Sequence, residues 1–239
     1  MKKALWTVLF LTTLVTRPAF ALAPAEGSPT DPLAHYRFDG SAKDEKPWNP
    51  DFQLENTEFR DNALYLNGIY GVGGTPNEFR AVCPTPHLDY HQFTVALRFK
   101  AEDFNAKMVN LFSGGTSYRW FGMFRSRAGN LTITLNNADF SHEIKTARLT
   151  PGKWTVVACG VDLPKRRVSV FFDGKKAAGF DLPAGFKLEV IGSPAEERDK
   201  VWWFSNYANG TTFHGLVDEC IIYGQMLSDD ELSRIPLHP

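Results

Sequence analysis

Short runs in which apolar and polar residues alternate recur along this chain, and they limit its fold more than any other feature. In residues 92–101, Phe93, Val95 and Leu97 share one side of an extended chain, and polar side chains take the other. A period of two is the side-chain repeat of a β-strand, whereas a helix has a period of about 3.6. The same alternation returns in residues 129–137 and 166–175. The pattern predicts a strand in each of these segments.

Two further runs, residues 153–162 and 215–224, are apolar on both faces, which is typical of central strands in a covered sheet. Turn residues separate the runs, as at Asp173-Gly174 in a predicted hairpin. Helical periodicity is almost absent outside the C-terminal end. Many short strands separated by turns are typical of an all-β, two-sheet antiparallel sandwich, which the sequence therefore predicts.

Residues 1–21 have the pattern of an export signal. Two lysines precede an apolar stretch over residues 4–15, and Ala19-Phe20-Ala21 forms a small-x-small cleavage site. The apolar stretch is too short to span a bilayer, and no later stretch is longer, so no membrane span is expected. The signal predicts an exported product, either periplasmic or secreted.

The rest of the chain divides into a leader and one domain. Residues 22–32 are rich in Pro and Ala and are expected to form a flexible leader. Residues 33–239 have an ordinary length for a single sandwich domain. The formal net charge of −1 for the whole chain leaves no electrostatic footprint for nucleic acid.

Five carboxylates crowd into residues 213–235, next to the C-terminus. Ser228 and Glu231 fit a capping box, and the two aspartates between them suit the positive end of a helix dipole. Asp218 and Glu219 are neighbours in a predicted strand, so they are expected to point to opposite faces of its sheet. The cluster therefore predicts a closing strand and a short C-terminal helix, and not a pair of cooperating catalytic acids.

Several segments together resemble the laminin-G-like, or concanavalin A-like, jelly-roll superfamily, which includes the pentraxins. They are "LAHYRFDGSAKDE", "NALYLNG", "FTVALRFKAEDF", "KWTVVACGVDLPKRRVSVFFDGK" and "FHGLVDECIIYGQMLSDDEL". They occur in the family's order and cover nearly the whole predicted domain. The resemblance implies a jelly-roll sandwich, but it leaves function open, because one fold carries many kinds of site.

The chain has three cysteines, Cys83, Cys159 and Cys220, so at most one internal disulfide can form. The resemblance to pentraxins implies a cysteine pair that joins two strands, and here the positions hold Cys159 and Ala96. That bridge cannot form. We therefore expect three unpaired, mostly buried thiols.

The superfamily also includes enzymes, which carry recognisable catalytic motifs. The retaining glucanases of the superfamily carry a Glu-x-Asp-x-Glu or Glu-x-Asp-x-x-Glu motif on one strand. The motif places two carboxylates on one face, where they act as nucleophile and general acid. Neither spacing occurs in this chain, nor does the Arg/Gln-His/Tyr constellation of alginate-lyase relatives. We expect no catalytic activity, with a glycoside hydrolase or polysaccharide lyase with an unrecognised site as the alternative.

Calcium is the one cofactor that the resemblance to pentraxins implies. Glu196, Glu197 and Asp199 match one of the pentraxin ligand runs, whereas the other falls near Asn130, which offers the only side-chain oxygen there. Calcium requires six or more oxygen ligands, so half of the expected set is missing. Calcium binding is therefore an open alternative.

Two aromatic stretches have the composition of a ligand-binding rim. They contain Tyr118, Arg119 and Trp120, and Trp202, Trp203, Asn206, Tyr207 and Asn209. An aromatic face beside a few polar groups suits a sugar ring, although core packing is the commoner use of such aromatics. Because Trp202 and Trp203 are neighbours in a predicted strand, one of the two could face outward.

These features predict a non-catalytic, exported binding module that recognises a carbohydrate or an extracellular protein through its rim loops. A structural or adhesive envelope module without a small ligand is the further alternative.

Overall fold

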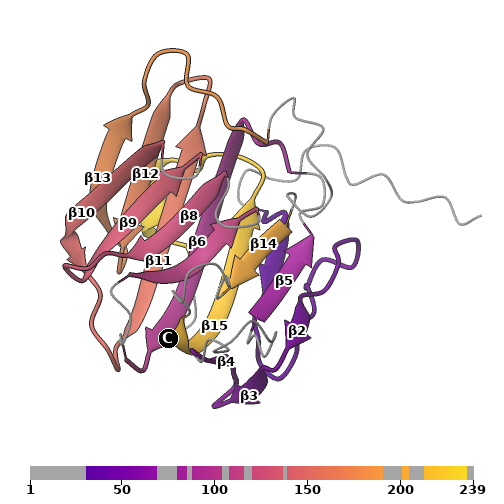
Figure 1. The fold of residues 1–239 in the computed structure, drawn as a ribbon. Helices are drawn as coiled ribbons and strands as arrows, with labels where there is room; N and C mark the ends of the chain where they lie inside the picture. Colours follow the sequence, from indigo (N-terminus) through magenta and orange to yellow (C-terminus); the bar gives the residue numbers. More distant parts are fainter. Residues whose placement is uncertain are drawn as a thin grey trace, which may run out of the picture.

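Two antiparallel β-sheets stack face to face and enclose the apolar core (Figure 1). The computed structural model describes residues 31–68, 80–84, 88–103, 108–115, 120–136, 139–190, 201–204 and 213–235. The predicted all-β, jelly-roll sandwich with a short C-terminal helix is confirmed.

The larger sheet, called sheet A, holds the last strand of the chain in a central position. Its order is β13 (Lys175–Asp181), β12 (Arg167–Phe172), β11 (Trp154–Asp162), β6 (Gln92–Ala101), β15 (His214–Tyr223), β4 (Ala63–Asn67) and β3 (Glu58–Arg60), with β1 (Ala34–Tyr36) also paired to β15. The two runs that are apolar on both faces form β11 and β15, which flank β6. They are central strands, as predicted.

The second sheet, called sheet B, lies across the core from sheet A. Its order is β10 (Phe140–Arg148), β9 (Asn130–Leu135), β8 (Phe121–Arg125), β7 (Val109–Gly114), β14 (Val201–Phe204), β5 (Arg80–Pro84) and β2 (Gln53–Glu55). Alternate residues of both sheets fill the space between them. Burial of each large apolar side chain there contributes about 1.5–3 kcal/mol.

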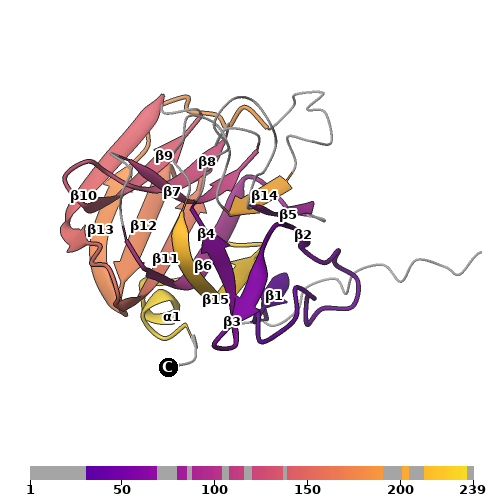
Figure 2. The same cartoon turned by 60° about the horizontal axis from the view of Figure 1, so that its bottom comes forward.

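The C-terminal helix α1 (Asp229–Ser233) packs on the outer face of sheet A (Figure 2). Leu232 of the helix joins a small apolar cluster with Ile221 of β15 and Ala96 of β6. The predicted capping box is confirmed, since Ser228 accepts from the Glu231 amide and Glu231 accepts from the Ser228 amide. Hydrogen bonds from Ser228 hold the pKa of the Glu231 carboxyl below its usual value.

All three cysteines are unpaired and buried, as predicted. The residue opposite Cys159 across β6 is Val95, and Ala96 faces Ala158 instead. Burial raises the pKa of the Cys83 thiol to about 12, and it also raises the pKa of Cys159 and Cys220. A thiol with a raised pKa reacts slowly, because the thiolate is the nucleophile.

Thiol titration provides the first test of this core. Without reductant, we expect no cysteine to react with a thiol reagent in the native protein and three to react after unfolding in denaturant. One reactive thiol per unfolded chain would show that a disulfide forms and would contradict the buried-thiol arrangement.

Candidate functional site

The neighbouring tryptophans of β14 point to opposite faces of sheet B. Trp202 is 1% exposed and belongs to the core, whereas Trp203 is only partly buried. This agrees with the prediction that one of the pair could face outward. Trp203 is therefore the one described aromatic among the candidates that a ligand on the outside of sheet B can reach.

Trp120 and Trp202, both proposed from the sequence as ligand-binding residues, are core residues in the structure. Their ring centroids lie 4.5 Å apart, and Trp202 also stacks on Phe112 at 5.1 Å. Trp120 is 1% exposed. Both side chains pack between the two sheets. The prediction that they bind a ligand is therefore corrected: they are packing residues.

The remaining rim candidates lie outside the described residues. They are Tyr118, Arg119, Asn206, Tyr207 and Asn209, together with the proposed calcium ligands Glu196, Glu197 and Asp199. Their roles stay predictions.

Asn130, the other proposed calcium ligand, begins β9. Its side-chain nitrogen donates to Glu143 Oε1 at 2.9 Å, and Ser126 donates to the same oxygen. Within the described ranges, no group of three His, Cys, Asp or Glu side chains is arranged to hold a metal ion. Calcium binding through Asn130 stays a prediction.

Trp203 belongs to a row of residues that crosses the outer face of sheet B, and the other members of the row have small side chains. Trp203 lies opposite Ser113 on β7, and Ser113 lies opposite Gly122 on β8. Gly122 in turn lies opposite Thr134 on β9. A Cβ atom at Gly122 would come within 2.7 Å of the Thr134 hydroxyl, so only glycine fits at the centre of this row.

A second row runs beside the first on the same face. Asn110 of β7 pairs with Phe124 of β8, and Phe124 pairs with Thr132 of β9. Phe124 is 1% exposed, yet it lies outside the core clusters that the described residues form. We call the two rows the sheet B strip and define it as Asn110, Ser113, Gly122, Phe124, Thr132, Thr134 and Trp203.

Three polar atoms of the sheet B strip are buried without a hydrogen bond. They are Asn110 Oδ1, Thr132 Oγ1 and Thr134 Oγ1. The three residues are 9% exposed or less. A buried polar group without a partner costs about 1–3 kcal/mol, so these atoms have hydrogen-bonding capacity to offer a ligand or an ordered water.

The outer face of sheet A carries the two acids of the closing strand. A β-bulge interrupts the pairing of β15 with β6 between Val217 and Glu219, and Asp218 is the extra residue. Arg98 lies between the core residues Leu97 and Phe99, so it faces outward, and its Nη1 donates to Asp218 at 2.6 Å. The Asp218 carboxylate is therefore on the outer face.

Glu219 reaches the same outer face. Its Oε1 contacts Nε2 of His35 at 2.5 Å, and His35 faces outward because Ala34 and Tyr36 on either side are core residues. The prediction that Asp218 and Glu219 point to opposite faces is wrong, because the bulge inserts one residue into the alternation. Each acid nevertheless has its own partner: Asp218 forms an ion pair with Arg98, and Glu219 contacts the His35 ring.

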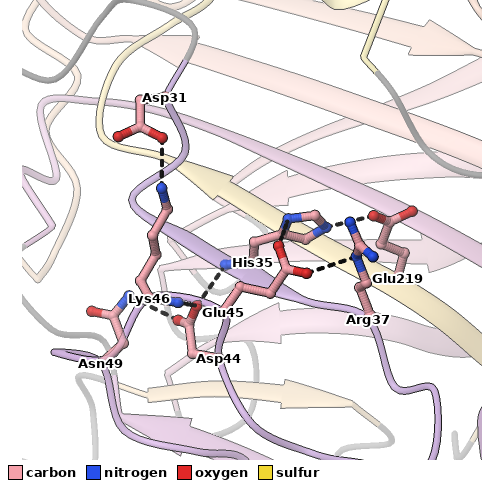
Figure 3. Close-up of polar contacts among 8 residues, drawn as sticks. All are labelled: Asp31, His35, Arg37, Asp44, Glu45, Lys46, Asn49 and Glu219. Carbon is pink, nitrogen blue, oxygen red and sulfur yellow. Dashed lines mark hydrogen bonds and ion pairs between the residues drawn. The ribbon is translucent and has the colours of Figure 1, made fainter.

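His35 bridges two carboxylates, as Figure 3 shows. Its Nδ1 lies 2.8 Å from Glu45, which also pairs with Arg37, and its Nε2 contacts Glu219. Beside it, Asp44 accepts the backbone amides of His35 and Lys46. Burial raises the pKa of Asp44. The network fastens the segment around β1 to the closing strand.

A second histidine is held in a similar way at the other end of β15. His214 Nδ1 lies 2.8 Å from Asp103, and its Nε2 lies 3.0 Å from the Tyr65 hydroxyl and 3.1 Å from Glu102. The sequence pattern did not single out either histidine. Apart from Glu45, which lies ten positions from His35, their partners are more than a hundred positions away, so local sequence could not have identified either network.

Comparison with known families and structures places this geometry in context. A family model of the concanavalin A-like lectin/glucanases superfamily matches residues 77–233. Among curated proteins, no match to the sequence was found.

Solved structures with a similar fold include three that contain carbohydrate-related ligands. Domain 4 of AbnA, an extracellular GH43 arabinanase from Geobacillus stearothermophilus in complex with arabinotriose, is 19% identical with a TM-score of 0.64, over 84% of this chain and 95% of that one. The CBM40 of the Ruminococcus gnavus IT-sialidase, bound to α2,3 sialyllactose, is 24% identical with a TM-score of 0.50, over 61% and 82%. The binding domain of botulinum neurotoxin DC in complex with SialylT is 10% identical with a TM-score of 0.62, over 86% and 51%.

Within the part of the chain that the structure describes, no helix has the length and apolar character needed to cross a bilayer.

Proposed function

Because the chain belongs to the concanavalin A-like lectin/glucanases superfamily, we propose that it is a non-catalytic carbohydrate-binding module whose glycan lies on the outer face of sheet B. One observation carries the proposal. Trp203 shares that face with three buried polar atoms that have no hydrogen-bond partner.

A sugar ring has the chemistry to match this face. Its apolar side can stack on an indole, and its hydroxyl groups both donate and accept hydrogen bonds. Thr132 and Thr134 are alternate residues on the outward side of β9, and the side-chain Oδ1 of Asn110 lies two strands away on β7.

The similar structures support a glycan as the ligand and suggest which glycans to test first. Arabinotriose and α2,3 sialyllactose occur in complexes of domains with this fold. These two oligosaccharides form the core of a screening panel.

The test is calorimetric titration of the panel into the wild type and two tryptophan variants. For the glycan that binds, Trp203→Ala is expected to weaken affinity at least about tenfold, which corresponds to about 1.4 kcal/mol. Trp48→Ala is the matched control, because Trp48 is 41% exposed, it lies in the turn between β1 and β2, and it is not part of the sheet B strip, so its loss should leave affinity unchanged.

Other outcomes would point to the alternatives. Equal affinity in the wild type and in Trp203→Ala would move the binding site away from the sheet B strip. Turnover of a panel member would favour a glycoside hydrolase or polysaccharide lyase. A panel without any binding would favour a protein ligand or an adhesive envelope role.

We also propose that the module is exported to the periplasm or secreted. The support is the signal pattern of residues 1–21, which lie outside the described residues.

A further inference from the structure

A cavity of about 370 Å³ is lined by residues of β15, of helix α1 and of the segments that flank the helix. Helix α1 lies on the outer face of sheet A, away from sheet B (Figure 2). The cavity walls are mainly apolar and include Ile221 of β15, Leu227 before the helix and Ile235 after it. The volume falls within the range of small-molecule sites, about 300–1,000 Å³. The glycan-binding proposal makes no use of this cavity.

Tyr223 of β15 supplies the unusual group in the wall. It is 4% exposed, and it lines the cavity. The other polar lining groups have partners. His35 lies between two glutamates, Glu231 belongs to the capping box, and Arg234 pairs with Asp230. A phenol in the wall of a mainly apolar cavity offers a ligand one directional hydrogen bond.

The charges around Tyr223 define what the hydroxyl can do. Burial, and then the nearby carboxylates of Glu219, Asp31 and Glu231, raise the pKa of Tyr223. The phenol therefore stays protonated at neutral pH and is available as a hydrogen-bond donor. The same carboxylates disfavour an anionic group placed next to it.

We propose that this cavity binds a small, neutral, mainly apolar molecule that accepts a hydrogen bond from the Tyr223 hydroxyl. The apolar walls supply most of the affinity, and the hydroxyl selects for an acceptor. This makes the protein a two-site module, with a second ligand on the sheet opposite the proposed glycan surface.

Matched aromatic probes test the proposal in the full-length protein. Acetophenone carries a neutral acceptor, ethylbenzene has a similar shape without one, and benzoate carries a negative charge. Ligand-observed NMR titration should give a dissociation constant on the order of millimolar for acetophenone, with benzoate at least about tenfold weaker.

Two variants locate the binding. Tyr223→Phe should weaken acetophenone about fivefold, the typical value of one net hydrogen bond, and leave ethylbenzene unchanged. Ile235→Trp fills the cavity from its partly exposed rim and should abolish the binding of both probes. Trp203→Ala should leave both unaffected, which separates this site from the proposed glycan surface.

Three results would overturn the proposal: no binding of acetophenone at millimolar concentration, equal loss of acetophenone and ethylbenzene in Tyr223→Phe, or binding that survives Ile235→Trp. Loss of probe binding in Trp203→Ala would place the probe on sheet B and would also overturn it.

Discussion

Trp202→Ala is expected to lower the free energy of unfolding by about 3–5 kcal/mol, the usual range for loss of a large aromatic side chain from a core. Trp202 is 1% exposed and packs against Trp120, Phe112 and Phe93 between the two sheets. Alanine would leave a cavity that the surrounding rigid rings cannot close. Urea unfolding followed by circular dichroism measures the loss.

The neighbouring residue provides the matched control. Trp203→Ala removes the same side chain from the other face of β14, where it is only partly buried, and should cost about 1 kcal/mol. The two variants thus separate stability from ligand binding: position 202 should govern the first and position 203 the second. Similar losses at both positions would mean that the two faces of β14 are not distinct.

The period-two pattern predicted the strands and the faces that they bury. Leu131, Ile133 and Leu135 were expected on one side of a strand, and all three are fully buried in the core. Such agreement is expected because alternation is imposed by the pleat itself, independently of what packs against it. The capping box was equally local and equally predictable.

The bulge at Asp218 shows where this kind of reasoning fails. Alternation assigns faces correctly only if no residue is inserted, and "LVDEC" contains no glycine or proline to mark an insertion. The bulge becomes visible only in the pairing register with β6, which depends on a strand more than a hundred residues away. Local sequence therefore could not reveal that both acids share one face.

The candidate site was partly predictable for a related reason. The adjacency of Trp202 and Trp203 predicted that one of them could face outward, and the alternation in residues 129–137 places Thr132 and Thr134 on the polar side of a strand. Their grouping with Ser113 and Gly122 depends on the strand order of sheet B, in which β7 joins β14 across a long stretch of sequence. Composition alone also could not assign Trp120 to the core, because tryptophans of the core and of the rim occur in similar local sequences.

His35→Leu is expected to have the second large effect on stability, about 3–5 kcal/mol, the usual loss when a buried carboxylate loses its polar partner. Glu219 is 1% exposed, and the substitution takes away the imidazole that contacts its carboxylate. The contact also ties β1 to β15, because the two side chains lie on adjacent strands. Chemical denaturation at neutral pH measures the change.

The partner substitutions determine whether the loss comes from the stranded carboxylate. Glu45→Gln removes the exposed half of the bridge, where the carboxylate is 43% exposed, and should cost less than about 1 kcal/mol. His35→Leu combined with Glu219→Leu replaces the pair with apolar groups and should recover much of the stability, because no buried charge is left behind. If the double variant is instead less stable than His35→Leu by the full cost of a second substitution, the two residues act independently. The Glu219–His35 contact would then contribute nothing to holding the first strand on the sheet.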